Sequence, residues 1–342
     1  MKRILISRTD NLGDVVLTLP MCGVIKQTYP DSYLFFLGKA YTRPLIDLCS
    51  HIDGFLDWDE ISTRKLFSEQ VRLISELQID IVIHVFPVKE ICRLTKRAGI
   101  PIRIATLGRS FTWFYCNRLL YLPRKCSMTH EALLNIRMLK GIGLNSHISE
   151  HDIPDFYGLD PSRLFPDPSF PSQENKAIRA RRGSERFSLI LHPKSKGSAR
   201  EWGLENFGTL IEMLPVERFS ILITGTREEG LQMAHFLKRY QHRVTDLTGK
   251  LSLQEFIAVI ARSDGLVAAS TGPLHIAAAL GKKVIGIYAP MRPIFPQRWA
   301  PLGKNAHYLV LDKKCSKCRT SSDCECIRSI TPESVFRLLN AS

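Results

Sequence analysis

No apolar run in the 342-residue sequence approaches the roughly 18–20 residues that a membrane-spanning helix requires. The first residues also lack a secretory pattern, because their short apolar run gives way at once to Ser7, Arg8 and Asp10. Zinc-finger spacing, an RNP-type strand and a basic leucine-zipper pattern are all missing from the sequence. These absences predict a cytoplasmic protein that does not bind nucleic acid.

A glycine-rich phosphate-binding fingerprint is also missing from the place where a Rossmann-type unit would carry it. The apolar run at 4–6 ends in a polar loop, and a helical pattern follows, which is typical of a first strand-to-helix turn. Gly13 stands alone in this loop, and Asp10 and Asp14 stand where a dinucleotide-binding loop would expose bare backbone. We therefore expect this loop to contact something other than phosphate.

Positive charge is in clear excess, with 47 Lys and Arg against 33 Asp and Glu and a formal net charge of +14. Such an excess favours an acidic partner, and a phosphorylated small molecule or an anionic membrane surface would fit. The alternative is a basic protein whose charge serves solvation alone. A hydrophobic content of 44% is that of a globular protein, and the length suffices for two domains with separate cores.

Short apolar runs alternate with amphipathic stretches in both halves of the chain, which predicts parallel sheets flanked by helices. The expected strands are 3–6, 33–37, 79–86 and 102–106, then 187–191, 219–223, 265–269 and 284–288. The expected helices are 14–28, 41–50, 63–77, 88–98 and 128–139, then 205–214, 228–240, 253–261 and 273–280. The pattern predicts two Rossmann-like α/β domains, 1–165 and 186–330, with a proline-rich linker at 166–185 and a closing helix at 331–342.

The stretch "ASTGPLHIAAAL" indicates a binding site for a diphosphate in the second half. A strand ends here, and Pro273 is placed at the start of the next helix, where its missing N–H costs nothing. The backbone N–H groups of Thr271, Gly272, Leu274 and His275 would then face an anion, with the helix dipole behind them. The alternative is an ordinary turn in which Thr271 merely caps the helix.

Two further strand ends of the same half carry polar residues suited to a nucleotide. "HPKSKGSAREW" offers Ser195, Lys196 and Arg200, which could neutralise a diphosphate without a metal ion. "ITGTREE" presents Thr224 and Gly225, followed by Glu228, and a carboxylate there often accepts the ribose hydroxyls of a nucleotide. These loops together predict a nucleotide-binding domain.

Three stretches resemble, in order and spacing, the signature regions of glycosyltransferase family 9, the ADP-heptose:lipopolysaccharide heptosyltransferases; they are "RTDNLGDVVLTLP", "HPKSKGSAREW" and "STGPLHIAAALGKKVIGIY". The resemblance spans nearly the whole chain. It implies a GT-B fold, two Rossmann-like domains facing across a cleft, with the donor bound by the second domain and the acceptor by the first. It also implies an inverting transfer of heptose from ADP-heptose to a lipid A-core acceptor, with no cofactor required for catalysis.

The resemblance also implies roles for individual residues. Asp14 would be the catalytic base, and Arg8, Asp10 and Asn11 would line the acceptor side of the same loop. Members of the family often have Lys where this chain has Arg200, and arginine can hold a diphosphate but cannot act as an acid. Ser270 stands where the family often has an Asp that contacts the transferred sugar, so the implied donor site departs from the usual pattern.

Alternative functions remain open at this stage. A transferase that uses another ADP- or UDP-linked sugar would fit Ser270, and a nucleotide-sugar epimerase could share the architecture. A non-enzymatic basic binding module is a third alternative, although it would have no use for the carboxylate of Asp14. For the transferase, the net charge and an amphiphilic anionic acceptor predict peripheral attachment to the cytoplasmic face of the inner membrane.

The nine cysteines fall into two groups. Those at 22, 49, 92, 116 and 126 are expected to be buried thiols in a reducing compartment. The segment "CSKCRTSSDCEC" holds four more, and it predicts either a structural zinc site or surface thiols that form a reversible disulfide; the four are Cys315, Cys318, Cys324 and Cys326. The neighbouring pair His130 and Glu131 fits a helix cap better than an acid/base pair.

Overall fold

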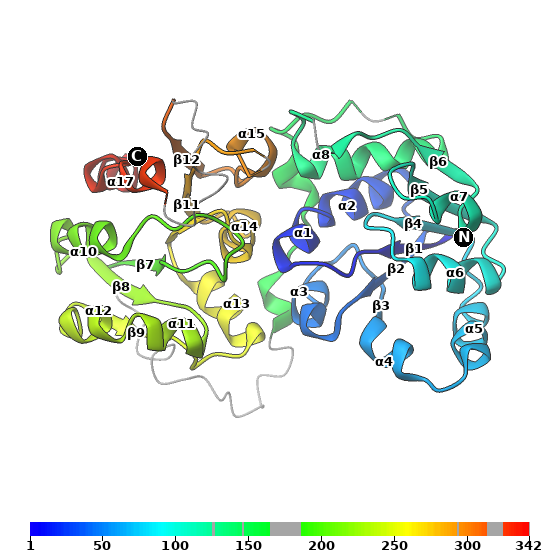
Figure 1. The fold of residues 1–342 in the computed structure, drawn as a ribbon, viewed down its shortest axis with the longest axis horizontal. Helices are drawn as coiled ribbons and strands as arrows, with labels where there is room; N and C mark the ends of the chain where they lie inside the picture. The colour runs from blue at the N-terminus through cyan, green and yellow to red at the C-terminus, as the bar shows by residue number, and fades with distance from the viewer. Residues whose placement is uncertain (125–126, 146, 165–185, 293, 313–323, 342) are drawn as a thin grey trace. The chain divides into compact units, whose positions relative to one another are not determined.

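The computed structural model describes the chain except for residues 125–126, 146, 165–185, 293, 313–323 and 342 (Figure 1). The chain divides into two compact units, Met1–Leu164 and Phe165–Ser342. Each unit contains one six-stranded sheet in which all the paired strands run parallel, so the predicted α/β class is confirmed. The predicted linker at 166–185 lies outside the described residues. Within the described part, none of the helices has the length and apolar character needed to cross a bilayer.

The sheet of the first unit has the order β3-β2-β1-β4-β5-β6. Its strands are β1 (Arg3–Ser7), β2 (Tyr33–Gly38), β3 (Gly54–Asp57), β4 (Ile81–His84), β5 (Ile102–Thr106) and β6 (Arg118–Leu120). Ser7, at the end of the central strand β1, is aligned with Leu37 on one side and His84 on the other. The loops that follow these three strands therefore leave the sheet at the same edge, where α/β proteins bind ligands.

Helices cover both faces of this sheet. On one face, α5 (Phe67–Glu76) and α6 (Lys89–Arg97) bury apolar side chains against Leu5 and Val82. Elsewhere in the unit α2 (Leu19–Thr28) contacts α8 (Glu131–Ile136). The shorter helices are α1 (Leu12–Val16), η1 (Ala40–Thr42), α3 (Arg43–Ile46), α4 (Trp58–Thr63), α7 (Thr112–Tyr115), η3 (Arg137–Ile142), η4 (Ile153–Phe156) and η5 (Pro161–Leu164).

The helix predicted at 14–28 is two helices, α1 and α2. Pro20 is the second residue of α2, and because proline has no N–H it cannot donate a hydrogen bond to the preceding turn. The backbone of Leu17 and Thr18 closes α1, and the Thr18 hydroxyl donates to the Asp14 carbonyl at 2.8 Å. The consequence is a short α1 that holds Asp14 in its first turn.

The sheet of the second unit has the order β12-β11-β10-β7-β8-β9. Its strands are β7 (Phe187–His192), β8 (Phe219–Ile223), β9 (Val244–Asp246), β10 (Gly265–Ala269), β11 (Lys283–Tyr288) and β12 (Ala306–Val310). The helices are α10 (Leu204–Met213), α11 (Arg227–Gln232), α12 (Ala234–Arg239), α13 (Leu253–Arg262), α14 (Gly272–Ala279), α15 (Pro296–Trp299), α16 (Glu325–Arg328) and α17 (Pro332–Asn340). Helix α10 contacts α17 on one side of the sheet, and α13 contacts α14 (Figure 1).

Trp202 anchors the loop between β7 and α10 in the core of the second unit. Its side chain is completely buried, its indole N–H donates to the carbonyl of Ile330 at 2.7 Å, and its ring meets Phe207 edge-on. An indole that is both buried and hydrogen-bonded fixes the position of the chain around it. The end of the basic loop is therefore rigidly placed.

The eight strands predicted from apolar runs are the four inner strands of each sheet. The outer strands β3, β6, β9 and β12 were not predicted. Three of them have four or fewer residues, and all are only partly buried, so they lack the continuous apolar run of an inner strand. Their pairing depends on the neighbouring strand rather than on a strong local pattern.

Candidate active site

One buried guanidinium organises the loop that follows β1. Arg8 is 3% exposed, and its Nε donates to Asp10 Oδ1 at 2.7 Å while its Nη2 donates to Asp14 Oδ1 at 2.5 Å. Both carboxylates that looked out of place in a phosphate-binding loop are thus held by the same side chain. Asn11 occupies the cap position of α1 and Asp14 is the third helical residue, so Asp14 is not the residue that caps the helix.

Glu131 adds a third carboxylate to this cluster from α8. It is 2% exposed, lies 3.6 Å from Arg8 Nη1 and accepts a hydrogen bond from Arg124. Asn135 Oδ1 accepts from Arg124 at 2.9 Å and from Arg8 at 3.4 Å. His130 caps α8, since its Nδ1 accepts from the N–H of Ala132 at 3.2 Å, which confirms the capping interpretation. The ionic role of Glu131 was not foreseen.

The cluster has three carboxylates and two guanidiniums, so full ionisation would leave one uncompensated negative charge in a buried place. Burial raises the pKa of Asp14 to about 6, Arg8 opposes that rise, and Asp10 and Glu131 add to it. Burial alone would lower the pKa of Arg8, but the same three carboxylates raise it, so Arg8 stays charged. Asp14 is therefore the group that exchanges a proton near neutral pH, which is the property of a general base.

The predicted diphosphate loop of the second unit starts α14. Thr271 is in the cap position, Gly272 and Pro273 are the first two helical residues, and no acidic side chain follows in the first turn. Within the described structure, the buried Oγ1 of Thr271 has no hydrogen-bond partner, so Thr271 stands at the cap position without making a side-chain cap hydrogen bond. Leu274 is buried and can offer only its backbone N–H. His275 is buried beside it.

The basic loop between β7 and α10 is held by its own hydrogen bonds. Ser195 is buried and its hydroxyl donates to the Ala199 carbonyl at 2.9 Å. The N–H of Lys196 donates to Glu229 Oε1 at 3.1 Å, and Lys196 has a left-handed backbone with φ of 50°, which leaves its side chain exposed. Ser195 therefore shapes the loop, while the cations that could meet a phosphate are Lys196 and Arg200.

Two neighbouring glutamates follow the third strand end, and they differ in burial. Thr224 is buried and its hydroxyl lies 2.9 Å from His192 Nδ1, with Gly225 directly after it. Glu229 is buried, completes a capping box with Thr226 at the start of α11 and holds Lys196. Glu228 is exposed, so its carboxylate is accessible to a ligand. The sequence pattern singled out Glu228, and the structural role of Glu229 was missed.

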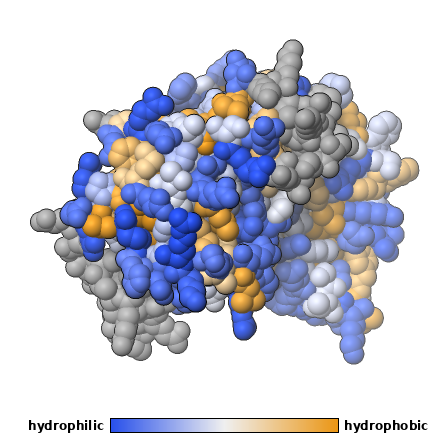
Figure 2. Space-filling model, turned by 60° about the vertical axis from the view of Figure 1, so that its left-hand side comes forward, coloured by the Kyte–Doolittle hydropathy of each residue, from blue (hydrophilic) through white to orange (hydrophobic). Residues whose placement is uncertain are grey.

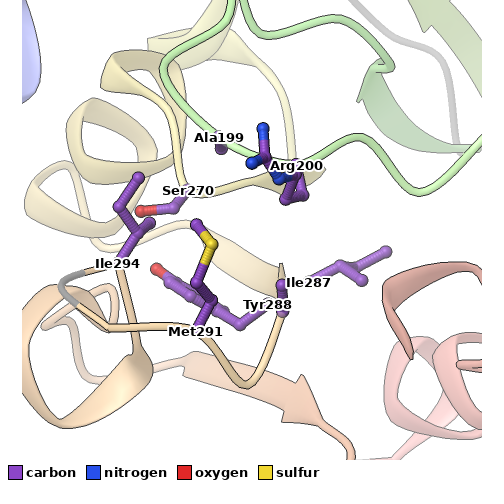
Figure 3. A pocket seen from close by; sticks show the side chains of 8 residues that line it. Ala199, Arg200, Ser270, Ile287, Tyr288, Met291 and Ile294 are labelled. Carbon is purple, nitrogen blue, oxygen red and sulfur yellow. The ribbon is translucent and has the colours of Figure 1, made fainter. Parts of the chain in front are cut away.

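A small pocket lies beside these loops in the second unit (Figure 3). Arg200 and Ser270 supply polar groups, and Ile287, Met291 and Ile294 supply apolar walls. Burial raises the pKa of Tyr288, which also lines the pocket, so its hydroxyl stays protonated. A few polar groups among apolar walls are typical of a small-molecule site.

Only part of the predicted cysteine site falls within the described residues. Cys324 and Cys326 are buried in the core of the second unit, and Cys326 belongs to the short helix α16. Cys315 and Cys318 lie outside the described residues. The predicted zinc site at these four cysteines stays a prediction.

Two parallel six-stranded sheets with ligand-side loops define a glycosyltransferase fold of the GT-B class. A solved glycosyltransferase of family 9 from Veillonella parvula covers 99% of this chain and 98% of its own, with a TM-score of 0.80 and 19% identity. ADP-heptose lipopolysaccharide heptosyltransferase II of Escherichia coli gives a TM-score of 0.75 at 19% identity and the same coverage. These likenesses confirm the predicted fold.

The chain belongs to glycosyltransferase family 9 (heptosyltransferase), because the model of that family matches residues 155–327. It is 26% identical over 311 residues to a Haemophilus influenzae protein whose glycosyltransferase name is provisional, with 88% of this chain and 86% of that protein covered. Lipopolysaccharide heptosyltransferase 3 of Escherichia coli K12 is 22% identical, over 84% of this chain and 82% of its own length. The protein is therefore a glycosyltransferase.

The acid limb of the pH–rate profile should depend on Glu131. We expect kcat/KM of glycosyl transfer to fall as the pH drops through about 6, where Asp14 takes up a proton. Glu131→Gln removes a negative neighbour that raises the pKa of Asp14, so the limb should move to lower pH. Glu333→Gln, an exposed change in the first turn of α17, is the control. An acid limb that stays in place in Glu131→Gln would contradict this assignment.

A carboxylate placed at the start of α14 should separate helix stability from anion binding. Gly272→Asp suits the helix dipole, so the melting temperature without ligand should hold or rise, whereas affinity for nucleoside diphosphates should fall by roughly tenfold or more. Titration calorimetry would measure the affinity of Gly272→Asp for a nucleoside diphosphate, with Ser334→Asp in the first turn of α17 as the matched control. Equal affinity in Gly272→Asp and the unaltered protein would place the diphosphate elsewhere.

Proposed function

We propose that this protein is an inverting heptosyltransferase that moves heptose from ADP-heptose to the inner core of a lipopolysaccharide acceptor. The observation that carries the proposal is the loop after β1, where Asp14 combines a pKa of about 6 with a fixed position against Arg8. Family membership and the heptosyltransferases among the relatives support heptose as the transferred sugar.

In the proposed reaction, Asp14 removes the proton from the acceptor hydroxyl as that oxygen attacks the anomeric carbon of the donor. The new carbon–oxygen bond forms on the face opposite the diphosphate, whose bond to the sugar breaks, and this inverts the anomeric centre. Arg8, Asp10 and Asn11 position the acceptor and the base. Because Arg8 is shared with Asp10 and Glu131, it orients Asp14 without keeping the pKa of Asp14 at the low value of an isolated ion pair.

The donor is proposed to bind to the second unit with its diphosphate at residues 271–275. The N–H groups at the start of α14, the Thr271 hydroxyl and the cations of Lys196 and Arg200 would stabilise the charge that develops on the departing ADP. The unpartnered Thr271 Oγ1 supports this position, since within the described chain that buried hydroxyl lacks a partner which a phosphate oxygen could supply.

The remaining donor contacts follow from the neighbouring loops. Thr224 and Gly225 would contact the nucleoside, with Glu228 accepting the ribose hydroxyls. Ser270 would face the sugar from the pocket that it shares with Arg200. Since Ser270 offers a neutral hydroxyl where family members often have a carboxylate, another nucleotide sugar is the second candidate donor, and a comparison of ADP-heptose with other ADP- and UDP-sugars would decide between them.

The first unit also carries a surface suited to a peripheral membrane protein. Trp113 and Phe114 on α7 and Tyr121 after β6 are 65%, 71% and 78% exposed. Exposed basic side chains adjoin them, namely Arg93, Lys96 and Arg97 on α6, Arg109 in the loop after β5 and Arg118 at the start of β6. Lys96 joins the two helices, because its ammonium donates to the Phe114 carbonyl at 2.7 Å. Aromatic and basic side chains together favour the interface of an anionic bilayer.

On the face that the second unit presents in Figure 2, hydrophilic residues prevail and apolar ones form small separate areas, so the proposed membrane contact is the aromatic and basic surface of the first unit. We propose that the surface attaches the enzyme to the cytoplasmic face of the membrane that holds the acceptor. The net charge of +14 supports an attraction that weakens with salt.

Replacing the proposed base should abolish most of the transfer without affecting the donor. Asp14→Asn should lower kcat by roughly 10²-fold or more while ADP affinity is retained, because an amide keeps the shape but cannot accept the proton. Asp10→Asn should retain most of the turnover. Transfer from ADP-heptose to a heptose-deficient lipopolysaccharide core would be measured for both. Near-normal turnover in Asp14→Asn together with its loss in Asp10→Asn would show that Asp10 is the base.

Vesicle flotation should separate the aromatic and electrostatic contributions to attachment. The protein is expected to float with anionic vesicles at low salt and to be released at high salt, and Trp113→Ala with Phe114→Ala should weaken flotation at least fivefold. Leu231→Ala, at a residue 72% exposed in the second unit, is the control for lost apolar surface. If the protein does not float at low salt, the proposed membrane attachment is wrong, and the positive charge serves only to bind the phosphates of the substrates.

A further inference from the structure

Three potential metal ligands meet in the first unit on residues that the proposed reaction does not use. A ring nitrogen of His84 and the Sγ atoms of Cys92 and Cys116 all lie within 4.8 Å of one another. His84 ends β4, Cys92 is in α6 and Cys116 directly follows α7, so the ligands come from three separate elements. His84 and Cys92 are fully buried, and Cys116 is 7% exposed.

The hydrogen bonds around His84 fix which nitrogen could bind a metal. When the Thr95 hydroxyl donates its single proton to the Cys92 carbonyl at 3.1 Å, it acts as an acceptor toward His84 Nε2, 3.2 Å away. In that arrangement Nε2 carries the ring proton and Nδ1 carries a lone pair. In the described structure this buried Nδ1 has no hydrogen-bond partner.

The two thiols complete a soft donor set. Cys92 and Cys116 are close enough to hydrogen-bond to each other. The hydrogen bond with Cys116 and burial raise the pKa of Cys92, and the same hydrogen bond lowers the pKa of Cys116, so a metal ion would have to displace the proton that the two thiols share. One imidazole and two thiolates suit zinc or another soft ion, and the Thr95 hydroxyl would orient the imidazole through its other nitrogen.

We propose that His84 Nδ1, Cys92 and Cys116 form a binding site for a zinc-class metal ion, separate from the cysteines near the C-terminus. Binding releases the two thiol protons, forms one nitrogen–metal and two sulfur–metal bonds and leaves the complex electrically neutral. Tetrahedral ligands around zinc lie about 3.3–3.8 Å apart, so the side chains would have to close by up to about 1.5 Å. A fourth position would be open to water. Such a site would tie β4, α6 and the end of α7 together.

The position of this site links it to the catalytic loop through the sheet alone. His84 is aligned with Ser7 in the neighbouring strand β1, and Ser7 precedes Arg8. No ligand of the site belongs to the Arg8 cluster, so metal binding is expected to stabilise the first unit without supplying a reacting group.

Metal binding would be measured on the full chain carrying Cys315→Ser and Cys318→Ser, reduced and freed of metal by a chelator. This background should bind one equivalent of Zn²⁺ by calorimetry, release protons and show a thiolate-to-metal absorption band with Co²⁺. His84→Gln, Cys92→Ser and Cys116→Ser should each lower the affinity more than tenfold. Cys22→Ser and Cys49→Ser, at two other buried thiols of the same unit, should leave it unchanged.

One further variant distinguishes a weakened metal site from a protein that no longer folds. Thr95→Val keeps all three ligands but removes the oxygen that fixes the ring of His84, so affinity should fall roughly tenfold while the metal-free melting temperature changes little. The proposal is overturned if the background binds no metal, or if His84→Gln and Cys92→Ser bind it as well as the background. A Cys92–Cys116 disulfide that forms without reductant, with no metal bound after reduction, would equally overturn it.

Discussion

The chemistry of the first unit depends on one buried guanidinium shared among three carboxylates. Arg8 alone could hold Asp14 as a tight ion pair, and the carboxylate would then be ionised but a weak base. Asp10 and Glu131 compete for the same guanidinium, and burial removes the water that would otherwise stabilise the negative charge. The result is a carboxylate with a rigid orientation and a pKa near 6, which is the combination that proton transfer from a hydroxyl requires.

The two units use one topology for opposite electrostatic purposes. In both, the loops that matter follow the central strands of a parallel sheet at its carboxyl edge. In the second unit these loops gather N–H donors, Lys196, Arg200 and the start of α14, whereas in the first unit they gather carboxylates around Arg8. The proposed role of Asp14 accounts for the missing glycine-rich fingerprint in the first loop, because a backbone that cradles phosphate would be of no use where a proton acceptor is needed.

The sequence predicted those features that are encoded locally. Inner strands form continuous apolar runs, and strand-end loops carry Gly, Thr and Pro, so both could be predicted from short patterns. The outer strands β3, β6, β9 and β12 could not, because they are short and partly exposed. The role of Glu131 also escaped prediction, since its partner Arg8 is 123 residues away along the chain and a glutamate after a histidine has no distinctive pattern of its own.

Glu228 and Glu229 show why side-chain burial decides between neighbouring candidates. Both follow the same strand and have the same chemistry, but Glu229 is the third residue of α11 and is used by the capping box and by the amide of Lys196. Its carboxylate therefore has little capacity left for a ligand, while that of Glu228 is exposed. A contact that Glu229 makes within the protein also shapes the basic loop, because it holds Lys196 in the left-handed backbone that turns the side chain outward. One glutamate thus holds the backbone of the basic loop, and the adjacent one keeps an accessible carboxylate, as the proposed contact with a nucleotide requires.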